Sequence, residues 1–137
     1  MVDTRFSLSV HIMVSLAYHQ GELMSSETLA AVLKTNPTFV RKLVSKLVEA
    51  DLVQSYRGKG GGIKLNRTPS SITLKEIYEA ATAEKTLVST HKKPVTKSCA
   101  VSCSMNEILC GIVGGIESCT KSYLSKISLG ELLKQVE

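Results

Sequence analysis

Four cysteine thiols are the most reactive side chains of this sequence, and all of them lie between positions 99 and 119. They are Cys99, Cys103, Cys110 and Cys119. In a reducing compartment, clustered cysteines indicate metal ligands, redox-sensitive thiols or plain thiols rather than a disulfide scaffold. Cys99, Cys103 and Cys110 are therefore candidates for a redox or metal site.

Basic side chains form a second group that could bind a partner. The chain has a formal charge of +5, and the excess lies in residues 1–67, which hold nine Lys and Arg against five Asp and Glu. Residues 68–137 hold eight against seven. Such an excess on one part of a chain is typical of a protein that binds nucleic acid. A solvated basic surface would also explain the charge. The choice between the two interpretations depends on which structural elements carry the basic residues.

The basic residues fall on a predicted helix-turn-helix followed by a hairpin. Residues 26–33 have the spacing of a short amphipathic helix. Asn36 is a suitable N-cap, and Pro37 a suitable first residue, for a second helix over 37–50. A strand over 53–56, a glycine-rich turn over 57–62 and a strand over 63–65 follow. This layout is typical of a winged helix, which offers one helix to the DNA major groove and a cationic loop to the backbone.

The rest of the sequence predicts a mainly α fold in which the hairpin wing is the small β element. Apolar spacing predicts a first helix over 3–20. Two similar segments, SITLKEI and KISLGEL, each contain a capping box that begins a helix, at Thr73 and at Ser128. A long helix is predicted between them. We expect a DNA-binding domain over 1–88, a loop over 89–101, and the long helix with a short terminal helix over 102–137.

The predicted long helix would extend about 37 Å, which is long for a chain of this size. Its apolar stripe includes Ile108, Ile112, Gly115, Ile116 and Cys119. Interior glycines destabilise a helix by roughly 1 kcal/mol each, a cost that close approach of a second helix would explain. We therefore expect a homodimer joined along this stripe. The alternative is a helix that folds back on its own domain.

With these motifs in place, the chain resembles the Rrf-type winged-helix transcriptional regulators, the family of IscR, NsrR and CymR. The resemblance rests on Thr35-Asn36-Pro37, the segment Val40-Arg41-Lys42-Leu43, the wing over 57–62, and the segments Ile72–Ile77 and Ile127–Leu132. It covers nearly the whole chain in order. It implies a homodimeric DNA-binding repressor joined through the long helix.

Six residues are the candidates for contact with a double-stranded DNA operator. By resemblance and helix geometry, Thr38, Phe39, Arg41 and Lys42 face the groove, whereas Arg57 and Lys59 lie on the wing. Arginine can read guanine edges with two hydrogen bonds, and lysine and threonine more often hold phosphate. Phe39 could instead belong to the core, and Lys42 could be an ordinary surface residue.

The cysteines do not identify the chemical signal to which such a regulator would respond. Cluster-binding members of the resembled family carry three cysteines at or before the start of the long helix, and the spacing here departs from that pattern. Cys103 and Cys110 would share a helix face about 10.5 Å apart, too far for a disulfide or a compact cluster. Cys119 falls on the apolar stripe and is expected to be buried. A thiol switch is the alternative to an iron–sulfur cluster, and incidental cysteines are the third interpretation.

No catalytic constellation is present, so we expect no enzyme. No apolar segment is long enough to span a membrane, and polar residues near the start argue against a signal peptide; the expected location is the cytoplasm. The sequence thus predicts a cytoplasmic DNA-binding regulator that requires no cofactor. The competing interpretations are an iron–sulfur sensor and a winged-helix module that binds proteins.

Overall fold

The structure is a computed structural model that describes residues 3–82 and 100–136. It is mainly helical, with one antiparallel hairpin, as the sequence predicted. Helix α1 (Arg5–Tyr18) precedes α2 (Ser26–Leu33), α3 (Pro37–Glu49) and the strands β1 (Val53–Tyr56) and β2 (Gly62–Leu65). A 3-10 turn η1 (Pro69–Ser71), α4 (Leu74–Thr82), α5 (Ala100–Leu124) and α6 (Leu129–Leu133) follow. Most of the loop expected over 89–101 lies outside the described residues.

The turn between α2 and α3 is built by capping residues. Ser25 caps α2 by accepting a hydrogen bond from the backbone N–H of Thr28 at 3.0 Å. Asn36 caps α3 in the same way, accepting from the backbone N–H of Thr38 at 2.7 Å. Pro37 occupies the first turn of α3, where its missing N–H leaves no helical bond unmade. These local interactions set where α3 begins, as the sequence indicated.

The core lies where the first four helices meet the hairpin. Ile12 of α1, Leu29 of α2, Leu47 of α3 and Ile77 of α4 are fully buried. Burial of such side chains is the main favourable term in folding, at about 25 cal/mol per Å² of apolar surface. The hairpin joins this core because Ile63 of β2 is buried and its backbone pairs with Met24. The hairpin is thereby held beside α1 and α3.

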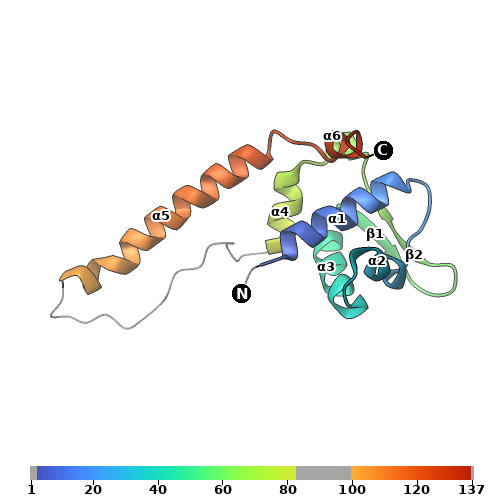
Figure 1. The fold of residues 1–137 in the computed structure, drawn as a ribbon, viewed down its shortest axis with the longest axis horizontal. Helices are drawn as coiled ribbons and strands as arrows, with labels where there is room; N and C mark the ends of the chain where they lie inside the picture. Colours follow the sequence, from blue (N-terminus) through green and yellow to red (C-terminus); the bar gives the residue numbers. More distant parts are fainter. Residues whose placement is uncertain (1–2, 83–99, 137) are drawn as a thin grey trace.

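The chain returns to this core after the long helix. The backbone N–H of Leu74 donates to the carbonyl of Ile127 at 2.9 Å, and that of Leu129 donates to the carbonyl of Ile72 at 2.8 Å. Thr73 and Ser128 thus form an antiparallel bridge, and Leu129 is fully buried. The similar segments SITLKEI and KISLGEL pair with each other. Helix α6 packs against α1 and η1, so this last helix lies on the winged-helix core (Figure 1).

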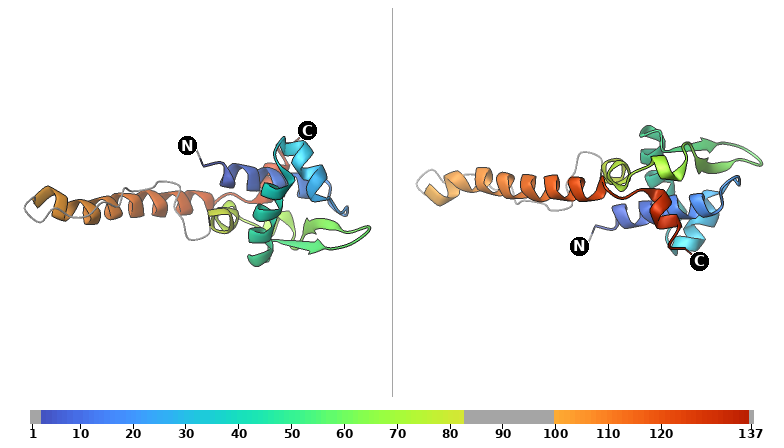
Figure 2. Two further views of the ribbon diagram at one scale, coloured as in Figure 1. Left: turned by 90° about the horizontal axis from the view of Figure 1, so that it is seen from below. Right: turned by 90° about the horizontal axis from the view of Figure 1, so that it is seen from above.

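Helix α5 extends away from the core (Figure 1), and two further views show the same projection (Figure 2). The expected span was about 102 to 126, and both ends of the helix lie two residues earlier, at Ala100 and Leu124. Its C-terminal part packs against α4, where Tyr78 donates a hydrogen bond to Glu117 at 2.7 Å. Leu124 is its one buried residue. Most of this helix therefore has no partner within the described chain.

Glu76 provides a test of the packing between the end of the hairpin and α4. Its carboxylate accepts hydrogen bonds from the guanidinium of Arg67 and the backbone N–H of Thr73. The bond from Arg67 lowers the pKa of Glu76, outweighing burial, which raises it. A carboxyl whose pKa is lower in the folded protein stabilises the fold above its ordinary value of 4.5. That contribution is lost as the pH falls through the lowered value.

We expect Glu76→Gln to reduce the free energy of unfolding by about 1 kcal/mol at about pH 7, because solvent screens a partly exposed pair. At about pH 3 the difference should be smaller, because below pH 4.5 the carboxyl of the unfolded chain takes up a proton more readily than the native one. Urea unfolding of the wild type and the variant, at equal protein concentration and at both pH values, measures the difference in the free energy of unfolding. Glu49→Gln, which alters an exposed carboxylate at the end of α3, is the matched control. A difference that is unchanged at the lower pH would contradict the ion pair's role.

Candidate nucleic-acid interface

Helix α3 separates its apolar and basic residues onto two faces. Val40, Leu43, Val44 and Leu47 are buried, and the intervening Arg41, Lys42, Ser45 and Lys46 are exposed. This division follows from the 3.6-residue period of the helix. The buried residues fix the helix against the core. The exposed ones are free to face a partner.

Two arginines converge on a cleft between α3 and the hairpin. The cleft has a volume of about 580 Å³ and is lined by Ser26, Arg41, Val44, Ser45, Ser55 and Arg57, among others. Arg41 comes from α3, whereas Arg57 directly follows β1. The two predicted groups of basic residues therefore belong to one surface. Concentrated positive charge beside hydroxyl groups suits phosphate and base-edge contacts.

The hairpin presents its basic residues on a tight turn. Tyr56 pairs with Gly62, and the backbone N–H of Gly61 donates to the carbonyl of Gly58 at 3.0 Å. Arg57 and Lys59 are exposed on this turn. Gly60 adopts φ = +82°, a backbone conformation that favours glycine. A Cβ at Gly61 would collide with the carbonyl oxygen of Tyr56. The glycines are therefore required by the shape of the wing.

The six predicted contact residues differ in their surroundings. Thr38, Arg41, Lys42, Arg57 and Lys59 are exposed. Phe39 is half-buried and packs against the core, in line with the alternative interpretation of that residue. Glu27, whose carboxylate contacts Arg41 at 2.8 Å, was not among the predicted residues. Its position in the first turn of α2, across the helix-turn-helix from α3, was the only signal available.

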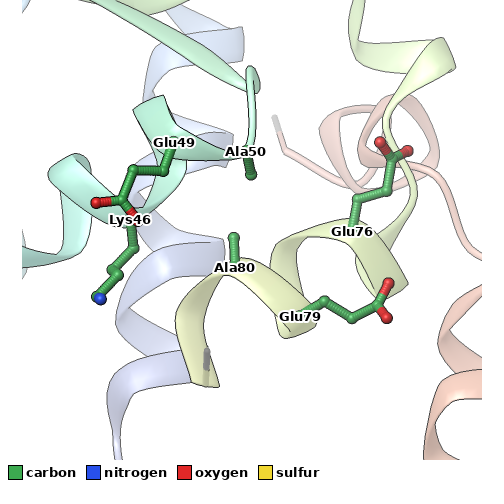
Figure 3. A pocket seen from close by; sticks show the side chains of 6 residues that line it. All are labelled: Lys46, Glu49, Ala50, Glu76, Glu79 and Ala80. Atoms are coloured by element: carbon green, nitrogen blue, oxygen red, sulfur yellow. The ribbon is translucent and has the colours of Figure 1, made fainter. Parts of the chain in front are cut away.

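The other side of α3 is acidic. A cleft of about 350 Å³ between α3 and α4 is lined by three glutamates, one lysine and two alanines (Figure 3). Ala50 and Ala80 point toward each other, whereas Glu76 and Glu79 extend to one side (Figure 3). Carboxylates repel phosphate, so this side does not suit a nucleic acid. Charge thus distinguishes the two sides of α3.

The predicted apolar stripe of α5 is exposed in the described chain. Ile108, Ile112 and Ile116 are 49%, 55% and 42% exposed. A Cβ added at Gly115 would meet nothing within 4 Å. Cys119, expected to be buried, is also exposed, because no other part of the described chain covers the stripe. Whether a second copy covers it stays a prediction.

The cysteines do not assemble a metal site within the described residues. Cys103 and Cys110 both lie on α5 and are exposed, and seven positions place them about 10.5 Å apart along the helix axis. No group of three His, Cys, Asp or Glu side chains that could hold a metal ion occurs among the residues that the structure describes. Cys99 lies outside them. The described thiols therefore do not fit one iron–sulfur cluster.

None of the helices in the described residues has both the length and the apolar character needed to cross a bilayer. Even α5, with 25 residues, does not meet that requirement.

Comparison with known proteins identifies related chains. A family model described as "Rrf2: Iron-dependent Transcriptional regulator" matches residues 2–135. YwnA of Bacillus subtilis, provisionally named an HTH-type transcriptional regulator, is 28% identical over 136 residues, covering 99% of both chains. The HTH-type transcriptional regulator NsrR of the same organism is 26% identical over 137 residues, covering 98% of this chain and 89% of its own.

A solved structure has a similar fold. CymR, described as the global cysteine regulator of B. subtilis, superposes with a TM-score of 0.68 at 23% identity. The match covers 100% of this chain and 98% of that one. The similarity extends over the winged helix and the long C-terminal helix alike.

The wing turn gives a test of its geometry. We expect Gly61→Ala to open the hairpin turn, because the added methyl group cannot coexist with the Tyr56 carbonyl. Overpacking of this kind costs about 1–3 kcal/mol. Amide hydrogen exchange of residues 53–65 should accelerate by at least about tenfold, with α1 little affected.

Gly111→Ala is the matched control, because a methyl group there meets open space on the described chain. It should leave exchange in the hairpin unchanged. Normal protection of the hairpin in Gly61→Ala would show that the turn tolerates a side chain.

Proposed function

Because the chain belongs to the Rrf2 family of transcriptional regulators, we propose that it is a homodimeric repressor that binds a pseudo-palindromic operator in duplex DNA. The observation that carries the proposal is the convergence of Arg41 and Arg57 on one exposed cleft between α3 and the hairpin. A DNA-binding regulator acts in the compartment that contains the DNA, so the cytoplasm is the proposed location.

Helix α3 is the proposed recognition helix. Its exposed N-terminal half carries Thr38, Arg41 and Lys42. An α-helix fits the major groove of B-DNA, where the guanidinium of Arg41 can donate two hydrogen bonds to O6 and N7 of guanine. Thr38 and Lys42 suit phosphate oxygens, which set the register of the protein on the duplex. Half-buried Phe39 holds the start of the helix in place.

The hairpin is the proposed backbone clamp. Arg57 and Lys59 lie exposed on a turn whose glycines let the main chain approach the duplex closely. Contacts of this kind neutralise phosphates and release counterions, so they contribute affinity for any sequence and make binding strongly dependent on salt. Base reading by α3 and phosphate binding by the wing are thus separate roles.

The second copy is proposed to pack along α5. Its stripe of Ile108, Ile112 and Ile116 is exposed along a helix of 25 residues. A contiguous apolar face of this kind is rare on a monomeric protein and marks an interaction surface. Two-fold symmetry would place the two α3 helices in successive major grooves, about 34 Å apart.

For the signal, we favour oxidation of exposed thiols over an iron–sulfur cluster. The family is described as iron-dependent, but Cys103 and Cys110 are too widely spaced to bind one compact cluster together. Both cysteines are exposed on α5, and exposure favours the reaction of a thiol with oxidants.

The competing function, a winged helix that binds proteins, is less well supported. An interaction surface of that class is usually rich in aromatic residues and poor in lysine. Here the exposed face of α3 and the wing carry Arg41, Lys42, Arg57 and Lys59 instead. The charge favours a phosphate-rich partner.

The separate roles of wing and helix lead to a prediction. Arg57→Ala and Lys59→Ala should each weaken binding to every duplex by about tenfold and reduce the salt slope by about one. Arg41→Ala should instead reduce discrimination between the selected operator and random duplex by about 10- to 100-fold. Fluorescence anisotropy over a salt series, with an operator obtained by selection from random duplexes, measures both.

Lys134→Ala is the control, because Lys134 is an exposed cation beyond the winged helix, at the end of α6. Its affinity should match that of the wild type. Unchanged binding in all three variants would refute the DNA-binding proposal. Retention of a protein partner that is insensitive to salt would favour the competing function.

The dimer leads to a second prediction. Ile112→Asp should convert the protein to a species of 14.8 kDa, because burial of an unpaired carboxylate in an apolar interface is strongly unfavourable. Sedimentation velocity measures the mass. Operator affinity should fall by at least about 100-fold, because half of the contacts are lost.

Asn106→Asp adds a carboxylate on another face of α5 and should remain dimeric. If Ile112→Asp stays dimeric, the stripe is not the interface.

A further inference from the structure

An ion pair joins the two helices of the helix-turn-helix on its outer surface. The Nη2 atom of Arg41 on α3 lies 2.8 Å from the Oε1 atom of Glu27 on α2. The two side chains are 55% and 68% exposed. Pairs this exposed contribute little to folding stability. The main effect of this pair is therefore on the position and the available hydrogen-bond donors of Arg41.

The carboxylate distinguishes the two arginines of the cleft. Arg41 and Arg57 both line it, together with Ser26, the residue before Glu27. Among the ion pairs of the described residues, Arg41 has Glu27 as its partner and none involves Arg57. One arginine is held at a defined position. The other remains available on the wing.

Glu27 is held in its charged form. Its own backbone N–H, in the first turn of α2, lowers the pKa of the carboxyl, and Arg41 lowers it further. Hydrogen-bond donors at the start of a helix favour negative charge. The ion pair is therefore intact at neutral pH.

We propose that Glu27 is a positioning residue that directs the guanidinium of Arg41 toward base edges rather than phosphates. This inference rests on the proposed function. A guanidinium carries five N–H donors, and Glu27 occupies part of one end. The remaining donors can meet the two acceptors of a guanine edge. Glu27 therefore leaves the reading capacity of Arg41 intact.

Two physical effects support this role. The ion pair restricts the rotamers of Arg41 before DNA arrives, which lowers the entropy lost on binding to a base. The negative charge of Glu27 also repels nearby phosphates, so contacts that would divert Arg41 from the base become unfavourable. Repulsion of the wrong contact increases specificity even when it does not increase affinity. Arg57, lacking such a partner, remains a phosphate ligand.

The test compares base preferences. Wild type, Arg41→Ala and Glu27→Ala are each subjected to selection from a library of random-sequence duplex DNA. The base pair whose preference is lost in Arg41→Ala identifies the position that Arg41 reads. Glu27→Ala should reduce the preference at that same position by about fivefold to tenfold, with other positions unchanged. Its affinity for random duplex should be equal to or slightly above that of the wild type, because a negative charge is removed.

A double variant separates positioning from a structural effect. In the Arg41→Ala background, Glu27→Ala should cause no further loss of base preference, because the residue on which it acts is absent. Glu27→Gln, which keeps an acceptor oxygen but removes the charge, should be intermediate. Glu22→Ala is the matched control, since it removes an exposed carboxylate that precedes α2 and pairs with His19 instead. It should retain the wild-type preference.

Each outcome is decisive. If Glu27→Ala raises affinity for all duplexes and keeps the preference, Glu27 acts only as a general repulsive charge and the proposal fails. If it loses preference equally with and without Arg41, its role is structural and the proposal also fails. Failure of the wild-type protein to enrich any duplex would instead overturn the proposed function.

Discussion

The buried ring of Tyr78 is the contact that fixes the long helix relative to the winged helix. Tyr78 is 1% exposed, and its ring makes a T-shaped contact with that of Phe6 on α1, with ring centroids 5.5 Å apart. Its hydroxyl group reaches the carboxylate of Glu117 on α5 at 2.7 Å. Helix α4 also packs against α3. One helix thus packs against both the proposed recognition helix and the long helix, and it joins them through packed side chains.

Local signals in the sequence were sufficient for most of the fold. Asn36 and Pro37 predicted the start of α3, because a cap acts within three residues and needs no distant partner. The return of the chain could not be predicted with the same certainty. SITLKEI and KISLGEL were recognised as similar helix starts, but their backbone pairing at Thr73 and Ser128 joins segments far apart in the sequence. Periodicity describes faces of elements and does not identify which faces meet.

The same distinction applies to the site. The exposure of Arg41 and Lys42 followed from helical spacing, because the apolar positions of α3 had to face the core. Glu27 could not be found in that way, since its contact with Arg41 depends on the angle between two helices and on the rotamers of two long side chains. Cys119 shows the converse. Its place on the apolar stripe suggested burial, yet the stripe is uncovered in the described chain.

Within the described chain, helix α5 is held against α4 near one end. Its contacts with α4 lie near Glu117 and Lys121, and its start at Ala100 is about 25 Å beyond the first of these at helical rise. A tilt of about 10° at that joint would move the far end by roughly 4 Å, equal to the helical rise of about three residues. In a pair related by two-fold symmetry, opposite tilts would add. In such a pair, small rotations at the joint between α4 and α5 would become displacements large enough to change the separation of two distant surfaces.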